Sequence, residues 1–233
     1  MVKVMAIVNV TPDSFYEPSR VASYALSDRL PGLVSAGADI IDIGAVSTRP
    51  GAPAVPLEEE WRRLEPALEA WPGGAALSVD TTSSEIVRRT FAAVGRFIVN
   101  DISAGEDDPA MLATVAGLGL PYVAMHKRGN PTTMDSLTDY GDAGVVAAVL
   151  DYFDAFSRKA SALGLNDWIL DPGFGFAKTD EQNHELLHAL PEFKRFGRPV
   201  LVGLSHKRFT HGRTAACHLE AVLRGADILR MHI

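Results

Sequence analysis

Several features that would place the chain in a special class are missing from its 233 residues. It has one cysteine, Cys217, which excludes an internal disulfide and is typical of proteins from a reducing cytosol. Its hydrophobic runs are of strand length and are interrupted by Asp, Asn or Gly, so no membrane-spanning segment is predicted. Because residues 1–4 lead directly into the first predicted strand, we expect no signal peptide and a cytoplasmic protein.

Positive charge is also in short supply. The chain carries 22 Lys and Arg against 29 Asp and Glu, a net charge of −7, which argues against general affinity for nucleic acid. An anionic substrate would therefore need a local group of cations. No low-complexity run or change of composition divides the chain, and 47% of its residues are hydrophobic. We therefore expect a single globular domain over residues 1–233.

Short apolar segments alternate with helix-like segments from one end of the chain to the other. The apolar segments do not alternate with polar residues, which is typical of parallel strands buried on both faces. Eight strands with seven intervening helices predict a (β/α)8 TIM barrel. An open doubly wound sheet is the alternative, but the even spacing favours closure. The predicted strands are residues 4–10, 39–44, 77–81, 97–102, 121–126, 168–172, 200–205 and 228–232.

Local signals predict where some of these elements begin, break or end. Pro31 and Gly32 lie within the first helical segment and predict a break there. Thr82 and Glu85 resemble a capping box and predict the start of the third helix. The sequence ends at Ile233, directly after the eighth strand, so the last helix of the barrel is missing from it.

The stretch on which the site is centred is residues 168–178, where a short apolar strand ends at Asp171 and continues into a glycine-rich turn. A carboxylate buried at the end of such a strand is costly unless hydrogen-bond donors meet it. Asp171 either caps the next helix or binds a ligand. Since Thr179 and Gln182 already supply a capping box for that helix, we favour a ligand.

Polar side chains follow all eight predicted strands at their carboxyl ends, where TIM-barrel active sites lie. A single such residue is more often an ordinary loop residue, but a complete ring predicts a site for a small polar molecule. Asp80, Asn100 and Asp171 suit a flat heterocycle that carries N–H donors along its edge. The ring comprises Asn9, Asp42, Asp80, Asn100, Asp101, His126, Asp171, Ser205, Lys207, Arg230 and His232.

The cations of this ring predict a second subsite, for an anion. Arg230 and His232 lie two residues apart on the last strand and so point to the same side. TIM barrels commonly bind phosphate near this strand. Arg49, in the loop of residues 47–51, either reaches the same anion or is a solvated loop cation. Lys207 is a Schiff-base former, a positioning cation or a surface lysine, and its position alone does not decide.

Residues 184–188 match the pattern His-Glu-x-x-His of zinc proteases. They follow the capping box on the predicted sixth helix, away from the strand ends, and the sequence offers no evident third ligand nearby. We therefore interpret His184 and His188 as a pair on a helix surface, with a zinc hydrolase as the alternative.

An ordered set of segments, covering essentially the whole chain, resembles the signature motifs of dihydropteroate synthases. The first is Asn-Val-Thr-Pro-Asp-Ser-Phe at residues 9–15, and the second runs over residues 37–44 and continues at residues 47–51. The remaining motifs are Val79-Asp80-Thr81, Asn100-Asp101-Ile102, Met125-His126, Asp171-Pro172-Gly173-Phe174-Gly175-Phe176 and Arg230-Met231-His232.

This resemblance implies a TIM-barrel transferase of folate biosynthesis that joins 6-hydroxymethyl-7,8-dihydropterin pyrophosphate to 4-aminobenzoate and releases pyrophosphate. In this chemistry pyrophosphate leaves the exocyclic methylene first, and the arylamine then attacks the cationic pterin. Stabilisation of the leaving group should be the larger catalytic contribution. The resemblance also implies Mg²⁺ as cofactor, a homodimer, and sulfonamides as inhibitors. We expect neither nucleic acid nor membrane as a partner.

The matching motif positions imply a role for each candidate residue. The residues expected to bind the pterin are Asp80, Asn100, Met125, Asp171, Gly203 and Lys207. Those expected to hold pyrophosphate are Asn9, Arg49, Arg230 and His232. These four and Lys207 are the expected catalytic residues, with Lys207 a positioning cation and Asn9 the Mg²⁺ ligand, since substrate phosphates supply most of the coordination. The aminobenzoate side is expected to comprise Thr48, Phe176, Ser205 and His206.

The chain departs from the family pattern in three places. The usual Ser-Arg-Lys-Ser after the seventh strand is Ser-His-Lys-Arg at residues 205–208, followed by a shorter segment over residues 209–214. The usual Gly-Gly-Glu-Ser is Gly-Ala-Val-Ser at residues 44–47. Ile233 replaces the aspartate after the final histidine. These differences leave a pterin-binding barrel without synthase activity as the alternative function.

Overall fold

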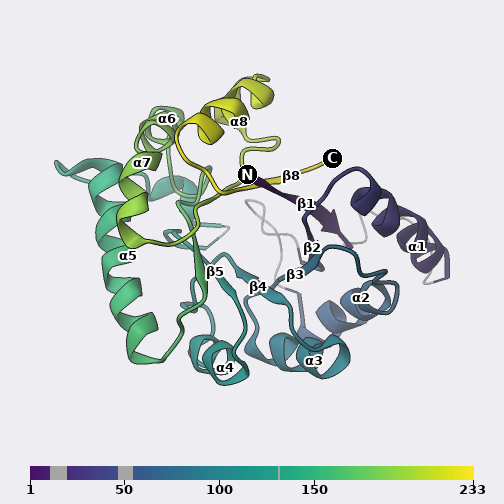
Figure 1. The fold of residues 1–233 in the computed structure, drawn as a ribbon. Helices are drawn as coiled ribbons and strands as arrows, with labels where there is room; N and C mark the ends of the chain where they lie inside the picture. Colours follow the sequence, from purple (N-terminus) through teal and green to yellow (C-terminus); the bar gives the residue numbers. More distant parts are fainter. Residues whose placement is uncertain (11–19, 47–54, 131) are drawn as a thin grey trace.

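The computed structural model describes residues 1–10, 20–46, 55–130 and 132–233, which form a ring of parallel strands with helices around its outside (Figure 1). All eight predicted strands are present, although the seventh is only two residues long. The strands are β1 (Lys3–Asn9), β2 (Ile40–Gly44), β3 (Ala76–Asp80), β4 (Ile98–Asp101), β5 (Tyr122–Met125), β6 (Trp168–Asp171), β7 (Leu201–Val202) and β8 (Ile228–Met231).

The sheet closes on itself and so confirms the predicted barrel. The strand order is β6-β5-β4-β3-β2-β1-β8-β7, and β6 meets β7 through a single parallel bridge between Leu170 and Val200. The amide of Leu170 also donates to the carbonyl oxygen of Pro199 at 2.9 Å. This is the weakest seam of the barrel, since the other neighbouring strands share between two and five paired residues.

A helical segment lies in each of the seven connections between strands, as predicted. Helix α5 shows why these segments form: its apolar residues recur every three to four positions and are buried, among them Val145, Val149, Phe153 and Phe156. The helices are α1 (Arg20–Ser35), α2 (Leu57–Glu69), α3 (Ser84–Val94), α4 (Met111–Leu118), α5 (Gly144–Ala162), α6 (Asp180–His188), α7 (Leu190–Phe193) and α8 (Thr214–Leu223). Short 3-10 turns are η1 (Met134–Ser136), η2 (Lys194–Phe196) and η3 (Arg208–Thr210).

The predicted break of the first helix is wrong, because α1 continues through Pro31 and Gly32. Both residues are exposed, so the proline ring and the flexible glycine face solvent. Leu30 and Leu33, on either side of them, are buried. Packing of this buried face outweighs the missing backbone hydrogen bond of Pro31.

Two predicted helix starts have different outcomes. The capping box placed at Thr82 is wrong by one residue, because Ser83 is the N-cap of α3 and its side chain accepts a hydrogen bond from the amide of Ile86. The capping box of Thr179 and Gln182 is confirmed at the start of α6, with both reciprocal hydrogen bonds present. Asp171 is therefore not needed to cap this helix.

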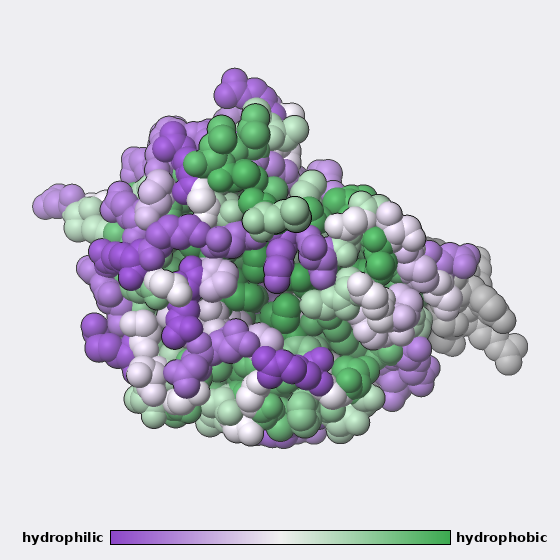
Figure 2. Space-filling view, viewed as in Figure 1, coloured by the Kyte–Doolittle hydropathy of each residue, from purple (hydrophilic) through white to green (hydrophobic). Residues whose placement is uncertain are grey.

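Helix α8 presents an apolar face to the outside of the molecule (Figure 2). Leu219 and Leu223 are 61% and 79% exposed, the largest exposed fractions among the leucines of the described residues. β8 is the last element of the given sequence and is followed by His232 and Ile233. Among the described residues, none of the helices combines the length and the apolar character that crossing a bilayer requires.

Candidate functional site

The inner face of the barrel changes from apolar to polar along its axis. Side chains two positions apart on a strand point to the same face. One apolar cluster combines residues from six strands: Met5, Ile40, Val123, Ile169, Leu201 and Ile228. Two positions further along the same strands, or just after them, come Ile7, Asp42, Met125, Asp171, Gly203 and Arg230. The apolar cluster therefore closes one end of the barrel, and the charged side chains of Asp42, Asp171 and Arg230 lie at the other.

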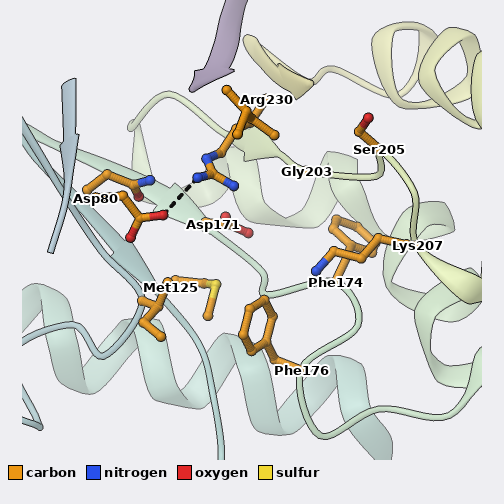
Figure 3. A pocket seen from close by; sticks show the side chains of 12 residues that line it. Asp80, Met125, Asp171, Phe174, Phe176, Gly203, Ser205, Lys207 and Arg230 are labelled. Atoms are coloured by element: carbon orange, nitrogen blue, oxygen red, sulfur yellow. Dashed lines mark hydrogen bonds and ion pairs between the residues drawn. The ribbon is translucent and has the colours of Figure 1, made fainter. Parts of the chain in front are cut away.

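A pocket lies at this polar end, where side chains from several strands point toward one space (Figure 3). Nine of the predicted site residues line it: Asp80, Asn100, Met125, Asp171, Phe176, Gly203, Ser205, Lys207 and Arg230. The structure thus brings together residues that are up to 150 positions apart in the sequence, as between Asp80 and Arg230. Their roles toward a ligand stay predictions.

A buried carboxylate lies next to this pocket and organises it. Asp42, on β2, is fully buried and accepts hydrogen bonds from three neighbouring side chains. Ser78 Oγ donates to Oδ1 at 2.6 Å, while Asn100 Nδ2 and Arg230 Nε donate to Oδ2 at 2.9 and 2.7 Å. Asp42 therefore links β2 to β3, β4 and β8 at the mouth of the barrel. The same three hydrogen bonds compensate for the burial of its negative charge.

Arg230 connects this network to the pocket wall. Its Nη2 donates to Asp80 Oδ2 at 2.8 Å (Figure 3). Because its Nε donates to Asp42, one guanidinium serves two carboxylates. Burial raises the pKa of Asp80, and the nearby Asp42 raises it further, while Arg230 opposes both effects. Burial lowers the pKa of Arg230, but the two carboxylates outweigh this and hold its pKa above the usual range. The arginine is thus a fixed cation at the pocket.

Asp171 lies at the end of β6, where the glycine-rich turn begins. It is buried, and its Oδ1 accepts a hydrogen bond from the amide of Gly173 at 2.8 Å. Burial raises the pKa of Asp171, and the Gly173 amide, Lys207 and Arg230 act in the opposite direction. Its carboxylate lines the pocket, which favours the ligand interpretation over the helix cap.

Lys207 approaches Asp171 from the loop after β7. Its Nζ lies 4.4 Å from the centroid of the Phe176 ring, a cation–π arrangement. Burial lowers the pKa of Lys207 to about 8, although Asp171 opposes this shift. The lysine passes close to Gly175, where an added Cβ would lie 3.0 Å from Lys207 Cδ. Glycine at this position lets the lysine reach the pocket.

The other predicted site residues lie around the rim. His232 and Ser205 are joined by a 3.1 Å contact between Nδ1 and Oγ. The ring of His206, which is exposed, packs edge-on against His232 with centroids 4.9 Å apart. Asn9 ends β1, and its Oδ1 lies 3.7 Å from the point that a Cβ on Gly44 would occupy. Thr48 and Arg49 lie outside the described residues.

Sequence reasoning missed four residues at or near the pocket, namely Ile7, Ile102, Phe174 and Lys178. Ile7, Ile102 and Phe174 line it. The two isoleucines lie in predicted strands, where the inward register could have identified them. Lys178 and His126 lie behind the pocket wall and contact each other. Lys178 ends the stretch of residues 168–178, and His126 belongs to the predicted ring of strand-end residues. The contact between them depends on the path of the turn and could not be predicted.

The histidines of the zinc-protease pattern are engaged elsewhere. His184 packs edge-on against Phe209 with ring centroids 5.4 Å apart, and His188 Nε2 lies 3.1 Å from Glu220 Oε1. Within the described part of the chain, no three His, Cys, Asp or Glu side chains are grouped so that they could hold a metal ion. The pair belongs to helix-packing contacts of α6.

The chain is similar to known proteins in both sequence and fold. Residues 5–232 match the family model described as pterin binding enzyme. The dihydropteroate synthase of Synechocystis sp. is 42% identical, over 98% of this chain and 84% of that protein. The structure of Xanthomonas albilineans dihydropteroate synthase with 4-aminobenzoic acid has a TM-score of 0.87 and 39% identity, covering 99% of this chain and 87% of that chain. That of the Yersinia pestis enzyme with a sulfonamide drug has a TM-score of 0.88 and 34% identity, covering 100% and 89%.

Gly173 should be the least replaceable glycine of the pocket. Its φ is +73°, and an added Cβ would lie 1.9 Å from the carbonyl oxygen of His126. Gly164 has nearly the same φ, +72°, but no neighbour within 4 Å, so Gly164→Ala measures the backbone strain alone. We expect Gly164→Ala to cost about 1–2 kcal/mol. Gly173→Ala should cost clearly more in urea unfolding, and equal losses for the two variants would contradict the close approach.

Proposed function

Because the chain belongs to the family of pterin-binding enzymes, we propose that its barrel mouth joins a pterin pyrophosphate to 4-aminobenzoate. The chain is a transferase of the dihydropteroate synthase type, an enzyme class of folate synthesis. The assignment of substrates rests on one observation: the pocket combines carboxylate and amide groups that suit a pterin with cations that suit a pyrophosphate. The buried Asp171 and Asn100 and the half-buried Asp80 line the same pocket as Lys207 and Arg230.

The pterin occupies the deep part of the pocket. Its guanidine-like edge carries N–H donors, which pair with Asp171 and Asp80 as an arginine pairs with carboxylates. Asn100 adds an amide, held in place by its bond to Asp42. Lys207 donates to an acceptor on the ring, and Met125 and Gly203 complete the pterin subsite.

The pyrophosphate lies toward Arg230 and His232, with Arg49 as a further cation. The contacts of Arg230 with Asp42 and Asp80 use two of its five N–H donors, and the others serve phosphate oxygens. The bond between the pterin methylene and oxygen breaks, and pyrophosphate leaves with the electron pair. The aminobenzoate nitrogen then attacks the methylene and loses a proton. Fixed cations at the leaving group lower the barrier of the first step.

The 4-aminobenzoate binds at the outer side of the pocket, against Phe176, Ser205 and His206, with Thr48 from the adjoining loop. Phe176 and Ser205 line the pocket, and His206 lies beside Ser205 at its rim. A sulfonamide, which has the same aromatic amine, competes for this side.

Asn9 would hold Mg²⁺, and oxygens of pyrophosphate and water would supply its other ligands. The local chemistry fits this ion: Asn9 Oδ1 and Asp80 Oδ2 are hard oxygen atoms, each 3.7 Å from the position of a Cβ on Gly44. Glycine leaves room above β2 that a side chain would fill. The described residues offer no larger group of metal-binding side chains, which suits an ion that arrives with its substrate. When bound, Mg²⁺ neutralises charge on the pyrophosphate.

We extend the proposal to a cytoplasmic homodimer. The exposed leucines of α8, Leu219 and Leu223, support a second copy at this face. The single cysteine supports a reducing compartment.

Turnover separates this function from a pterin-binding barrel without synthase activity. The protein is incubated with the pterin pyrophosphate, then with 4-aminobenzoate, and released pyrophosphate and dihydropteroate are quantified. Equal amounts of both products support the synthase. Binding of the pterin pyrophosphate without release, under conditions where a control synthase is active, would support the alternative.

Removal of Mg²⁺ should abolish turnover without unfolding the protein, because its ligands are mainly substrate and water. Activity is measured after chelation and after addition of Mg²⁺, alongside far-UV circular dichroism. Loss of secondary structure on chelation would show a structural metal and contradict the proposed site.

Asp171→Asn should weaken pterin binding at least tenfold and leave the fold intact. The amide keeps the shape but places a donor where the pterin presents donors, and an unpaired buried group costs about 1–3 kcal/mol. Affinity is measured by isothermal titration calorimetry, with circular dichroism as the fold control. A folded variant with unchanged affinity for the pterin would contradict the assignment of this pocket to the pterin.

A further inference from the structure

A second lysine, Lys178, lies behind the pocket wall. Only 6% of it is exposed, and its Nζ contacts three acceptors. It donates to the carbonyl oxygens of Gly173 and Phe176, both at 2.9 Å, and lies 3.0 Å from His126 Nδ1. The three N–H bonds of a lysine ammonium are thus matched by three acceptors in the described residues.

The contact with His126 specifies the tautomer of this histidine. A lysine ammonium has no acceptor, so Nδ1 must accept, and the ring proton is carried on Nε2. Burial, together with the charges of Lys178 and Arg128, lowers the pKa of His126 to about 2. The ring, which is 4% exposed, is therefore a neutral and fixed acceptor. Tyr152 from α5 packs edge-on against it, with centroids 5.0 Å apart.

Both carbonyl acceptors belong to the glycine-rich turn, so Lys178 closes that turn into a ring. The amide of Phe176 donates to the carbonyl oxygen of Gly173 at 3.1 Å, and the amide of Gly173 donates to Asp171. Between these bonds the turn carries two lining residues, Phe174 and Phe176. The positions of Asp171, Phe174 and Phe176 in the pocket therefore depend on how this turn is held.

We propose that Lys178, held by His126, is a positioning residue for pterin binding, which fastens the turn of residues 173–176 so that Asp171 and Phe176 keep their places in the pocket. The inference rests on the proposed function, since it assigns this pocket to the pterin. Lys178 is not among the residues that line the pocket, and it acts through the backbone of the turn.

The charge of Lys178 is sensitive to pH. Burial lowers its pKa to about 7, with Lys207 and Arg128 acting in the same direction and Asp171 opposing them. Of the other groups near it, His126 is neutral, and Tyr140 donates its hydroxyl proton to the carbonyl oxygen of Ala177 at 3.0 Å. A neutral amine has two N–H bonds and a lone pair, so it donates to at most two of the three acceptors, and its hydrogen bonds to the turn are no longer strengthened by charge. Above about pH 7 the turn is less firmly held.

The test compares dissociation constants for the pterin pyrophosphate between pH 6 and 8.5 in the wild type and Lys178→Met. We expect the variant to bind at least tenfold more weakly at pH 6, since hydrogen bonds to a charged group are lost. This ratio should shrink toward pH 8.5, because the wild-type lysine is then neutral as well. Taking the ratio cancels the titration of Asp80, which both proteins share. A ratio that stays constant over this pH range, or stays near one, would overturn the proposal.

Lys127→Met is the matched control for the loss of a buried lysine. Lys127 is 7% exposed and contacts both carboxylate oxygens of Asp107, at 2.7 and 2.8 Å, but does not touch the turn. Its loss should lower the melting temperature and leave pterin affinity within about twofold at every pH. A tenfold, pH-dependent loss of affinity in this control would equally contradict the proposal.

Histidine variants test the same contact if Lys178→Met fails to fold. His126→Asn keeps an acceptor near the place of Nδ1 and should retain pterin affinity. His126→Leu removes the acceptor and should weaken binding at pH 6. Equal affinities for the two variants would contradict a role for this contact.

Hydrogen exchange separates failure of this inference from failure of the proposed function. The amides of Gly173 and Phe176 should exchange faster in Lys178→Met than in the wild type at pH 6, without any ligand present. If the wild type binds no pterin pyrophosphate, the proposed function fails, while this exchange still decides whether Lys178 fastens the turn. Unchanged exchange in the variant would overturn the inference.

Discussion

The buried pairing of Asp42 with Arg230 is the interaction on which the site depends. A carboxylate with no exposed surface is tolerated only because Ser78, Asn100 and Arg230 all donate to it. The same three donors come from β3, β4 and β8, so satisfying one charge fixes the relative position of four strands at the barrel mouth. Arg230 then reaches Asp80, and Asn100 is turned to the pocket wall. The pocket is thus prearranged by a network whose central residue does not line it, in keeping with the value of fixed charges in a catalytic site.

A second constraint comes from the pleat of the strands. Because inward-facing positions recur every second residue, the register that packs the apolar cluster at one end also decides which residues reach the pocket at the other. Ile40 and Asp42 on β2, and Ile228 and Arg230 on β8, show this directly. Shifting a strand by one residue would turn its inward apolar residues toward the helices and remove its site residue from the barrel mouth, which couples the stability of the barrel to the geometry of the site.

Much of this arrangement is predictable from the sequence, for physical reasons. Buried parallel strands are continuous apolar runs, and their carboxyl ends meet at one edge, so Asp80, Asn100, Asp171 and Arg230 could be brought together before any coordinates. The features that depend on tertiary packing could not be predicted from the sequence. Helix α1 continues through Pro31 because the packing of its buried face outweighs the tendency of proline to break a helix. The ring formed by His126, Lys178 and the glycine-rich turn requires a backbone path that no pattern specifies. Arg230 was expected as a cation for an anion, and its pairing with two carboxylates emerges only from the closed barrel.

The most direct test of this view is the affinity of Asp42→Asn for the pterin pyrophosphate, measured by calorimetry with the fold checked by circular dichroism. The substitution keeps the volume of the side chain, and Asp42 itself is buried and does not line the pocket. If Asp42 prearranges Arg230 and Asn100, affinity should fall at least tenfold, since hydrogen bonds to a charged group are worth about 1.5–3 kcal/mol. A folded variant that binds the pterin pyrophosphate as tightly as the wild type would contradict the central role of this network.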